Sequence, residues 1–221
     1  MGPEESPADH PVSCLDPQTR FLTACRTGEV WQVEECLACQ RLDINSPGED
    51  SLTGLMLAGR AGHGEVVGIL LSREDCHTNQ TDKDGDTALS HACCCGHYQV
   101  VTALLSSPLT DINTSDTDLV TPLHKAIANN HLDIVRLLLD QPQLEINAQN
   151  KYGFTALILA AGMGNYNIVK LLTELTIVDV NVVESNSCSA LMIACMHGYC
   201  AVAEELLERP DCDVNIGESV V

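Results

Sequence analysis

Apolar residues recur along the chain in short runs that have helical spacing. One run comprises Val66, Val67, Ile69, Leu70 and Leu71, and another comprises Ile134, Val135, Leu137, Leu138 and Leu139. Such a broad apolar stripe is typical of a helix that stacks in a core. Eight residues after each stripe stands an asparagine, and these are Asn45, Asn79, Asn113, Asn147, Asn181 and Asn215. The pattern predicts a repeated helical unit.

A second set of columns gives the repeat period as 34 residues, without an insertion. Each unit starts at a hydroxyl residue, and these are Thr19, Thr53, Thr87, Thr121, Thr155 and Ser189. Five positions later stands an alanine, at Ala24, Ala58, Ala92, Ala126, Ala160 and Ala194. Helices in close contact need a small residue at such a position. We therefore expect two closely packed helices in each of six units.

The first helix of each unit has a recognisable start and end. Thr and Ser are good N-cap residues, and Pro122 falls at the first helical position after Thr121. Four residues after each alanine comes a residue that tolerates the left-handed conformation in which helices end. These residues are Gly28, Gly62, Gly96, Asn130, Gly164 and Gly198. The columns predict a short capped helix at the start of every unit.

Turn-forming residues, as in 82–85 and 150–153, lie between the asparagine of one unit and the hydroxyl residue of the next. They favour a tight excursion that resembles a hairpin. One unit cannot bury its apolar face alone, so units of this kind stack and share one elongated core. We expect an all-α solenoid of antiparallel helix pairs with projecting hairpin loops.

The chain resembles the ankyrin repeat family in several columns. The resemblance rests on Thr121-Pro122-Leu123-His124, on the Gly62-His63 and Gly96-His97 pairs, on paired leucines and on ends such as Asp179-Val180-Asn181. It covers residues 16–221, with repeats at about 19–52, 53–86, 87–120, 121–154, 155–188 and 189–221. It implies helix pairs with β-hairpins that project at right angles.

Three features depart from the family pattern. The period is one residue longer than the usual value of about 33. Only the fourth unit has the complete Thr-Pro-Leu-His motif. The hairpin glycine is present at Gly85 and Gly153 but is replaced by Ser51, Leu119 and Ser187, which leaves the hairpin geometry open in those three units.

The two ends of the array have features of caps. One column has glutamate only in the first and last units, at Glu35 and Glu205, as the solvent-facing ends of a solenoid require. This column favours a complete array. Residues 1–15 are rich in proline and acidic residues, so we expect a disordered lead.

The charge of the chain restricts its partners. The formal net charge is -20, from 31 acidic and 11 basic residues. Such a surface repels phosphate backbones and anionic membranes, so we expect no direct nucleic-acid or membrane binding. The charge favours a partner with a basic face, although a general role in solubility explains it equally well.

The N-terminal residues match no export signal, and nowhere do eighteen consecutive apolar residues occur. We therefore expect an intracellular protein, cytoplasmic or nuclear, and the twelve cysteines are expected to be reduced thiols. We expect a monomer.

One cysteine and histidine cluster offers metal or redox chemistry. It comprises His91, Cys93, Cys94, Cys95 and His97, and thiolates and imidazoles are zinc ligands. The repeat columns favour a structural interpretation, because Cys93 shares a small apolar column with Cys25 and Ala161. A redox- or zinc-responsive regulatory module remains the alternative function. Cys36 and Cys39 form a C-x-x-C pair that has no second pair at zinc spacing.

The sequence has neither a nucleophile motif nor a phosphate-binding loop. We therefore predict a protein that is not an enzyme and that has no catalytic residue, metal or cofactor.

The resemblance implies a binding surface on the concave side, made of hairpin tips and exposed parts of the first helices. When the resemblance is applied column by column, one half of this surface is charged. Its residues are Glu49, Asp50, Arg60, Lys83, Asp84 and Asp86. The resemblance also selects an apolar half of Leu119, Val120, Tyr152, Phe154, Met163 and Met196. The hypothesis is an apolar anchor patch beside an acidic half that steers a partner protein with a basic and apolar face. Packing of Phe154 against Val120 is the structural alternative.

Two further features concern modification and docking. The resemblance implies that asparagines eight residues after a leucine are candidates for hydroxylation, and among them are Asn79, Asn113, Asn147 and Asn215. A purely structural role of the asparagine in its turn is the alternative. The end Ser219-Val220-Val221 resembles a ligand of PDZ domains.

Overall fold

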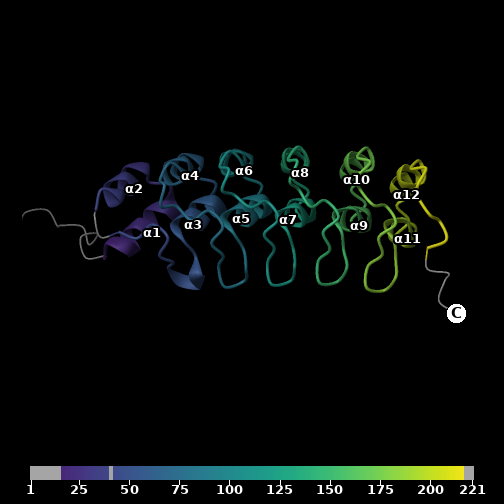
Figure 1. Ribbon diagram of the computed structural model, residues 1–221, viewed down its shortest axis with the longest axis horizontal. Helices are drawn as coiled ribbons and strands as arrows, with labels where there is room; N and C mark the ends of the chain where they lie inside the picture. Colours follow the sequence, from purple (N-terminus) through teal and green to yellow (C-terminus); the bar gives the residue numbers. More distant parts are fainter. Residues whose placement is uncertain (1–15, 40–41, 217–221) are drawn as a thin grey trace, which may run out of the picture.

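The computed structural model describes residues 16–39 and 42–216, and this part forms a single row of stacked units (Figure 1). The first helices are α1 (Pro17–Thr27), α3 (Gly54–Ala61), α5 (Ala88–Cys95), α7 (Pro122–Ala128), α9 (Ala156–Gly162) and α11 (Ala190–Met196). The second helices are α2 (Val30–Leu37), α4 (Gly64–Leu71), α6 (Tyr98–Leu105), α8 (Leu132–Leu139), α10 (Tyr166–Thr173) and α12 (Cys200–Leu207). The expected all-α solenoid of helix pairs is confirmed.

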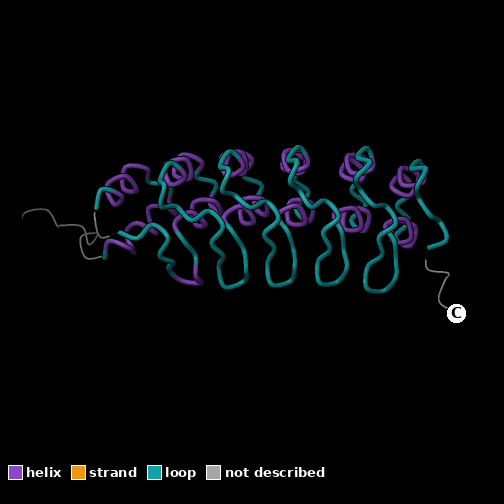
Figure 2. Tube along the Cα trace, viewed as in Figure 1, coloured by secondary structure: helices purple, strands orange, loops and turns teal. Residues whose placement is uncertain are grey.

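The two sets of helices form two parallel rows, and the connecting segments project beyond the first helices, all on one side (Figures 1 and 2). The projecting segments are hairpin-shaped loops in which the described residues form no named strand. Among the described residues of these loops, one pairing of strand type occurs, an isolated antiparallel bridge between Val183 and Ser189. The first loop contains a 3-10 turn, η2 (Glu49–Ser51). None of the described helices is both long and apolar enough to cross a membrane.

The N-caps follow the hydroxyl column in five of the six units. In the second unit the Thr53 hydroxyl accepts a hydrogen bond from the Met56 N–H at 3.3 Å, and the last four units repeat this contact. The first unit differs, because Asp16 caps α1 and Pro17 occupies the first helical position. The prediction that Thr19 caps this helix is therefore wrong. Pro17 fixes the start of α1 upstream of Thr19 because its ring presets a helical φ.

The residues predicted to end the first helices all adopt the left-handed conformation. Their φ values range from 58° at Asn130 to 82° at Gly62. The six column alanines are completely buried, as close contact between stacked helices requires.

The last four hairpin loops keep one geometry whether or not they contain glycine. A polar side chain opens each of the last four loops, and in the loop of Asp116 its Oδ1 accepts from the N–H groups of Asp118 and Val120, both at 2.9 Å. The fourth residue of the loop then has positive φ, which is 60° at Leu119 and 63° at Ser187. Ser51, at φ 62°, occupies the equivalent position of the first loop. At Leu119 and Ser187 the replacement of glycine therefore adds backbone strain without changing the turn. The first loop differs, because Asp50 also has a positive φ of 57°.

The asparagine column joins each unit to the next. Asn79 donates from Nδ2 to the Leu109 carbonyl at 2.7 Å and accepts at Oδ1 from the Asp111 N–H at 2.8 Å. Asn45, Asn113, Asn147 and Asn181 make the same pair of contacts. The asparagines thus serve as bridges between units, which goes beyond locking their own turns.

The two glutamates of the predicted caps have different environments. Glu35 is exposed and pairs with Arg20 of its own unit. Glu205 instead turns toward the preceding unit, where it accepts from the Tyr166 hydroxyl at 3.0 Å and from the Thr173 hydroxyl at 3.1 Å. Glu205 is therefore only partly exposed, in contrast to the expected solvent-facing glutamate, because the hydroxyls of buried Thr173 and exposed Tyr166 donate to its carboxylate. The expected disordered lead, residues 1–15, and the end at 219–221 lie outside the described residues.

Candidate binding face

We call the surface formed by the loops and the neighbouring parts of the first helices the hairpin face. It carries the residues that the resemblance selected, from Asp50 in the first loop to Met196 at the end of α11. Its charged and apolar halves differ in how many of their groups are available for a partner.

Several groups of the charged half are already paired within the chain. Lys83 donates to Asp50 at 2.8 Å between adjacent loops, and this contact lowers the pKa of Asp50 and raises the pKa of Lys83. Both side chains remain exposed, so the pair itself contributes little to stability. Arg60, Asp84 and Glu49 are exposed as expected.

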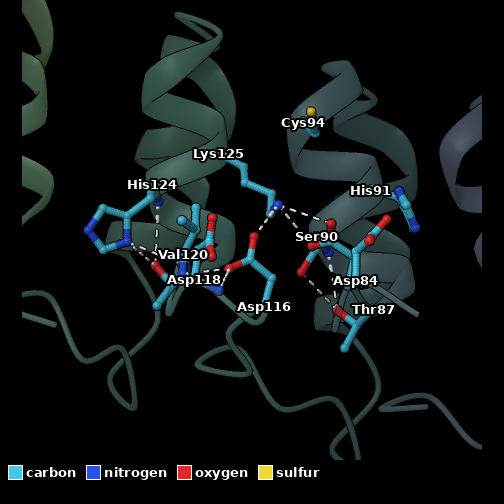
Figure 3. Close-up of polar contacts among 12 residues, drawn as sticks. Asp84, Thr87, Ser90, His91, Cys94, Asp116, Asp118, Val120, His124 and Lys125 are labelled. Carbon is cyan, nitrogen blue, oxygen red and sulfur yellow. Dashed lines mark hydrogen bonds and ion pairs between the residues drawn. The ribbon is translucent and has the colours of Figure 1, made fainter. Parts of the chain in front are cut away.

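Asp86 is less available to a partner protein than its position in the repeat predicts. Lys125 reaches from α7 and donates to Asp86 at 3.0 Å and to Asp116 at 2.8 Å (Figure 3). The Lys125 side chain is only 16% exposed. Burial alone lowers the pKa of Lys125, but its hydrogen bonds to Asp116 and Asp86 outweigh burial and raise it. This ammonium joins two loops, so Asp86 belongs to the internal structure of the stack.

His124 of the Thr-Pro-Leu-His motif is buried beside this network. Its Nδ1 accepts from the Thr121 N–H at 3.2 Å, and its Nε2 lies 3.0 Å from the Phe154 carbonyl in the next loop. An imidazole that accepts at Nδ1 and donates at Nε2 is neutral. Burial lowers the pKa of His124, which is consistent with the neutral form. The residue therefore links two loops and takes no part in the exposed surface.

The apolar half contains a groove between the last two units. Phe154, Met163 and Met196 line it together, with a volume of about 530 Å³. Met196 is 73% exposed and Met163 40%, whereas Phe154 is half-buried against the core. The structure thus brings three of the six predicted apolar residues to one place.

The other three predicted apolar residues lie outside the groove. Tyr152 is 54% exposed at a loop tip, where the Lys151 ammonium lies 4.9 Å from the centre of its ring. Leu119 is exposed at another tip, and Val120 is half-buried.

The sequence columns missed several residues that line the groove. These are Leu159, Gly162, Glu184, Asn186, Cys188, Ile193 and His197. A usable signal was present in the column nine residues after the polar residue that opens each loop. That column reads His91, Lys125, Leu159 and Ile193, so it changes from polar to apolar at the units that form the groove.

The cysteine and histidine cluster does not form one site. Cys93 is buried, and burial raises the pKa of its thiol. His97 lies 3.0 Å from the Arg60 carbonyl and His91 2.9 Å from the Asp82 carboxylate, while Cys94 lies away from His91 on α5 (Figure 3). Successive side chains on a helix point about 100° apart, so a continuous run cannot surround one ion.

Within residues 16–39 and 42–216, only Asp82, Asp86 and His91 bring three potential ligand atoms within 4.8 Å of one another. Their charges already have partners, since Asp82 contacts His91 and Asp86 contacts Lys125.

The candidate hydroxylation residues are not equivalent in the structure. Asn79, Asn113 and Asn147 use both ends of their amides to bridge units. Asn215 is exposed, and no bridge of its amide to another described residue is formed. Hydroxylation of any of them stays a prediction.

Comparisons with known proteins agree with this architecture. The family model for ankyrin repeats, in three copies, matches residues 21–116, 55–148 and 123–218. The structure is similar to the crystal structure of EF0377, an ankyrin repeat protein, with a TM-score of 0.80 and 26% sequence identity over 86% of this chain and 98% of that one. No curated protein sequence matches the chain. Because the family model spans most of the sequence, the chain belongs to the ankyrin repeat family.

Proposed function

We propose that this protein is a non-catalytic binding module, acting as a scaffold, adaptor or inhibitor that holds a partner protein on its hairpin face. Ankyrin repeats generally mediate binding to other proteins. The observation that carries the proposal is the apolar groove between the last two units, with Met163 and Met196 exposed at its rim. Exposed apolar patches with polar surroundings are typical of interaction sites.

The proposed partner is an intracellular protein with a basic and apolar face. The net charge of -20 supports this choice, because such a field attracts a cationic surface and repels nucleic acid. Tyr152 contributes a second anchor, since exposed aromatic residues often dominate the energetics of an interface. Capture by a PDZ domain at the C-terminus is a separate, secondary proposal.

Affinity capture with the complete chain tests the proposal. The wild type is compared with the double variants Tyr152→Ala/Phe154→Ala and Met163→Ala/Met196→Ala, and captured proteins are quantified by mass spectrometry. We expect both variants to lose the same specific partners, since truncation of a central anchor typically costs about 2 kcal/mol or more. The second variant is informative even if removal of half-buried Phe154 loosens its loop.

Trp31→Ala is the matched control, because Trp31 is 62% exposed but lies on α2, in the row of helices away from the loops. It should leave capture unchanged. Equal capture by the wild type and both double variants would contradict the proposal.

A further inference from the structure

Glu184 is a buried carboxylate without a cationic partner. It opens the last loop and is 5% exposed. Its Oε2 accepts from the Asn186 N–H at 2.9 Å and from Asn186 Nδ2 at 3.0 Å, and its Oε1 accepts from the Cys188 N–H at 3.3 Å. In the part of the chain that the structure describes, no lysine, arginine or histidine forms an ion pair with it. Its negative charge is therefore held by neutral dipoles alone.

Of the equivalent carboxylates in earlier loops, Asp116 has such a partner, and Asp82 contacts a histidine, which is a cation only when protonated. Asp82 lies 2.9 Å from His91, and Asp116 lies 2.8 Å from the Lys125 ammonium. In both units the partner stands nine residues after the carboxylate. The same position after Glu184 is Ile193, which is buried. The last loop therefore has the carboxylate of this arrangement, but an apolar residue stands in place of its partner.

Glu184 also lines the apolar groove. The surrounding side chains are Phe154, Leu159, Met163, Ile193 and Met196, and the groove encloses about 530 Å³. An uncompensated charge in surroundings of low polarity interacts more strongly with an incoming opposite charge than an exposed one does. The unbranched methionine side chains at the rim can adapt to large apolar groups of different shape.

We propose that the groove binds a protein segment that carries a lysine or arginine beside a large apolar side chain. The apolar side chain lies between Met163 and Met196, and the cation meets the Glu184 carboxylate in the position that Lys125 occupies relative to Asp116. This inference rests on the proposed function and specifies the partner chemistry of that site. Complementary charge selects the segment, while apolar burial supplies most of its affinity.

Selection from random twelve-residue peptides displayed on phage, with the complete 221-residue chain as target, provides the probe. Synthetic copies of the selected peptides are then measured by fluorescence anisotropy at physiological salt. We expect the peptides to share a basic residue beside a large apolar one. Replacement of the basic residue by norleucine should weaken binding to the wild type about fivefold or more.

Two variants of the protein assign this preference to the groove. On Glu184→Gln, the peptide and its norleucine analogue should bind with nearly equal affinity. Met196→Asp should weaken binding of the peptide about tenfold, because the substitution places a charge where the bound peptide buries its apolar side chain. Met196→Asp makes the protein more acidic, so attraction that depends only on net charge would strengthen instead.

The matched controls are the same kinds of substitution at residues outside the groove. Glu174→Gln removes an exposed carboxylate of the same unit, and Ile177→Asp places a charge at an exposed apolar residue outside the groove. Both should bind the peptide like the wild type. Circular dichroism confirms that each variant is folded, and the norleucine comparison on the wild type tests the charge even if Glu184→Gln is unstable.

Three results would overturn the inference. They are selected peptides that bind Met196→Asp as tightly as the wild type, a norleucine analogue that loses no affinity on the wild type, and a selection that yields no binding peptide. None of them decides the proposed function, which fails only if the capture of partner proteins is independent of the hairpin face.

Discussion

Leu119 occupies a backbone conformation that glycine adopts more easily. Its φ is 60°, and the equivalent residues Gly85 and Gly153 have φ values of 89° and 81°. A side chain in the left-handed region costs roughly 1–2 kcal/mol. Because the Leu119 side chain is exposed, little buried apolar area compensates for this cost. The loop geometry is held by the contacts of Asp116, which impose the turn on whatever residue stands there.

Leu119→Gly should therefore raise the free energy of unfolding by about 0.5–1 kcal/mol, after the greater freedom of glycine in the unfolded chain is subtracted. Urea unfolding followed by circular dichroism measures the change. Leu109→Gly is the control, since Leu109 is similarly exposed but has no positive φ. It should lower the free energy of unfolding, and stabilisation by both substitutions would refute the explanation.

His124 gives the stability of the stack a dependence on pH. Burial lowers its pKa below the ordinary value near 6.5, so the unfolded chain binds a proton at pH values where the folded chain does not. The contribution of neutral His124 to the free energy of unfolding is present above pH 6.5. It is lost as the pH falls toward the lower pKa that His124 has in the folded state. We expect the free energy of unfolding to decline from pH 7.5 to 5.5.

In His124→Gln this decline should be smaller, whatever the absolute loss of stability. Urea unfolding at several pH values measures the slope. His77→Gln, at an exposed histidine, should keep the slope of the wild type. An unchanged slope in His124→Gln would assign the pH dependence to other groups.

At the scale of the elements, a histidine follows the residue that ends the first helix in three units, and it docks its helix pair on the preceding one. His63 Nε2 lies 3.0 Å from the Arg26 carbonyl, and its ring occupies the space that a Cβ at Gly28 would need, 2.5 Å from that atom. His97 and His131 repeat this contact with the glycine before them. Between the fourth and fifth units, Asn130 replaces the glycine and Asn165 replaces the histidine. Between the fifth and sixth units, Tyr199 takes the place of the histidine beside Gly164.

The replacements at Asn130 and Asn165 depend on each other. Asn130 carries a Cβ where a docked imidazole would lie, and the shorter Asn165 avoids it. The cost is that the buried Asn165 Nδ2 has no hydrogen-bond partner among the described residues. Such an unsatisfied donor costs about 1–3 kcal/mol.

A double-mutant cycle tests this dependence. Asn165→His alone should destabilise the protein through the clash with Asn130, whereas Asn130→Gly/Asn165→His should recover the docked histidine. We expect a favourable coupling of about 1–2 kcal/mol in urea unfolding. A coupling near zero would show that the two residues vary independently.

Much of this architecture could be predicted from the sequence because it depends on residues close together within one unit. The caps at Thr53 and Thr121 and the left-handed helix ends are of this kind. The cap at Asp16 was missed because the column was extended to a unit where Pro17 moves the start of the helix. The pairing of Asp86 was missed because its partner, Lys125, comes from 39 residues further along the chain.

The groove shows the same limit of prediction. Exposed Met163 and Met196 could be selected by column, but the burial of Glu184 without a cation is a property of two units together. Only a comparison of the residue that opens each loop with the residue nine positions later would have revealed it.

At the scale of the molecule, the stability of the stack comes largely from the interfaces between neighbouring units. Within the described residues the sixth unit packs against the fifth alone, so its attachment there depends on few contacts. Arg209 supplies several of them, since Nη1 donates to the carbonyls of Thr173 and Leu175 at 2.9 Å and Nη2 donates to the Val178 carbonyl at 3.3 Å. The guanidinium is largely buried and also pairs with Asp211. It therefore fastens the last unit to the fifth.

Arg209→Ala should loosen the last unit selectively, at a cost of about 2–3 kcal/mol, because it leaves buried carbonyls without a donor. Hydrogen exchange should quicken over α11 and α12 and stay unchanged over α7 and α8. Arg73→Ala is the matched control, since Arg73 occupies the same column but is exposed and pairs with the neighbouring Asp75. Because Ile193 and Met196 of this unit line the groove, Arg209→Ala should also weaken any partner held there. Equal protection of α11 and α12 in Arg209→Ala and Arg73→Ala would mean that apolar packing alone holds the last unit.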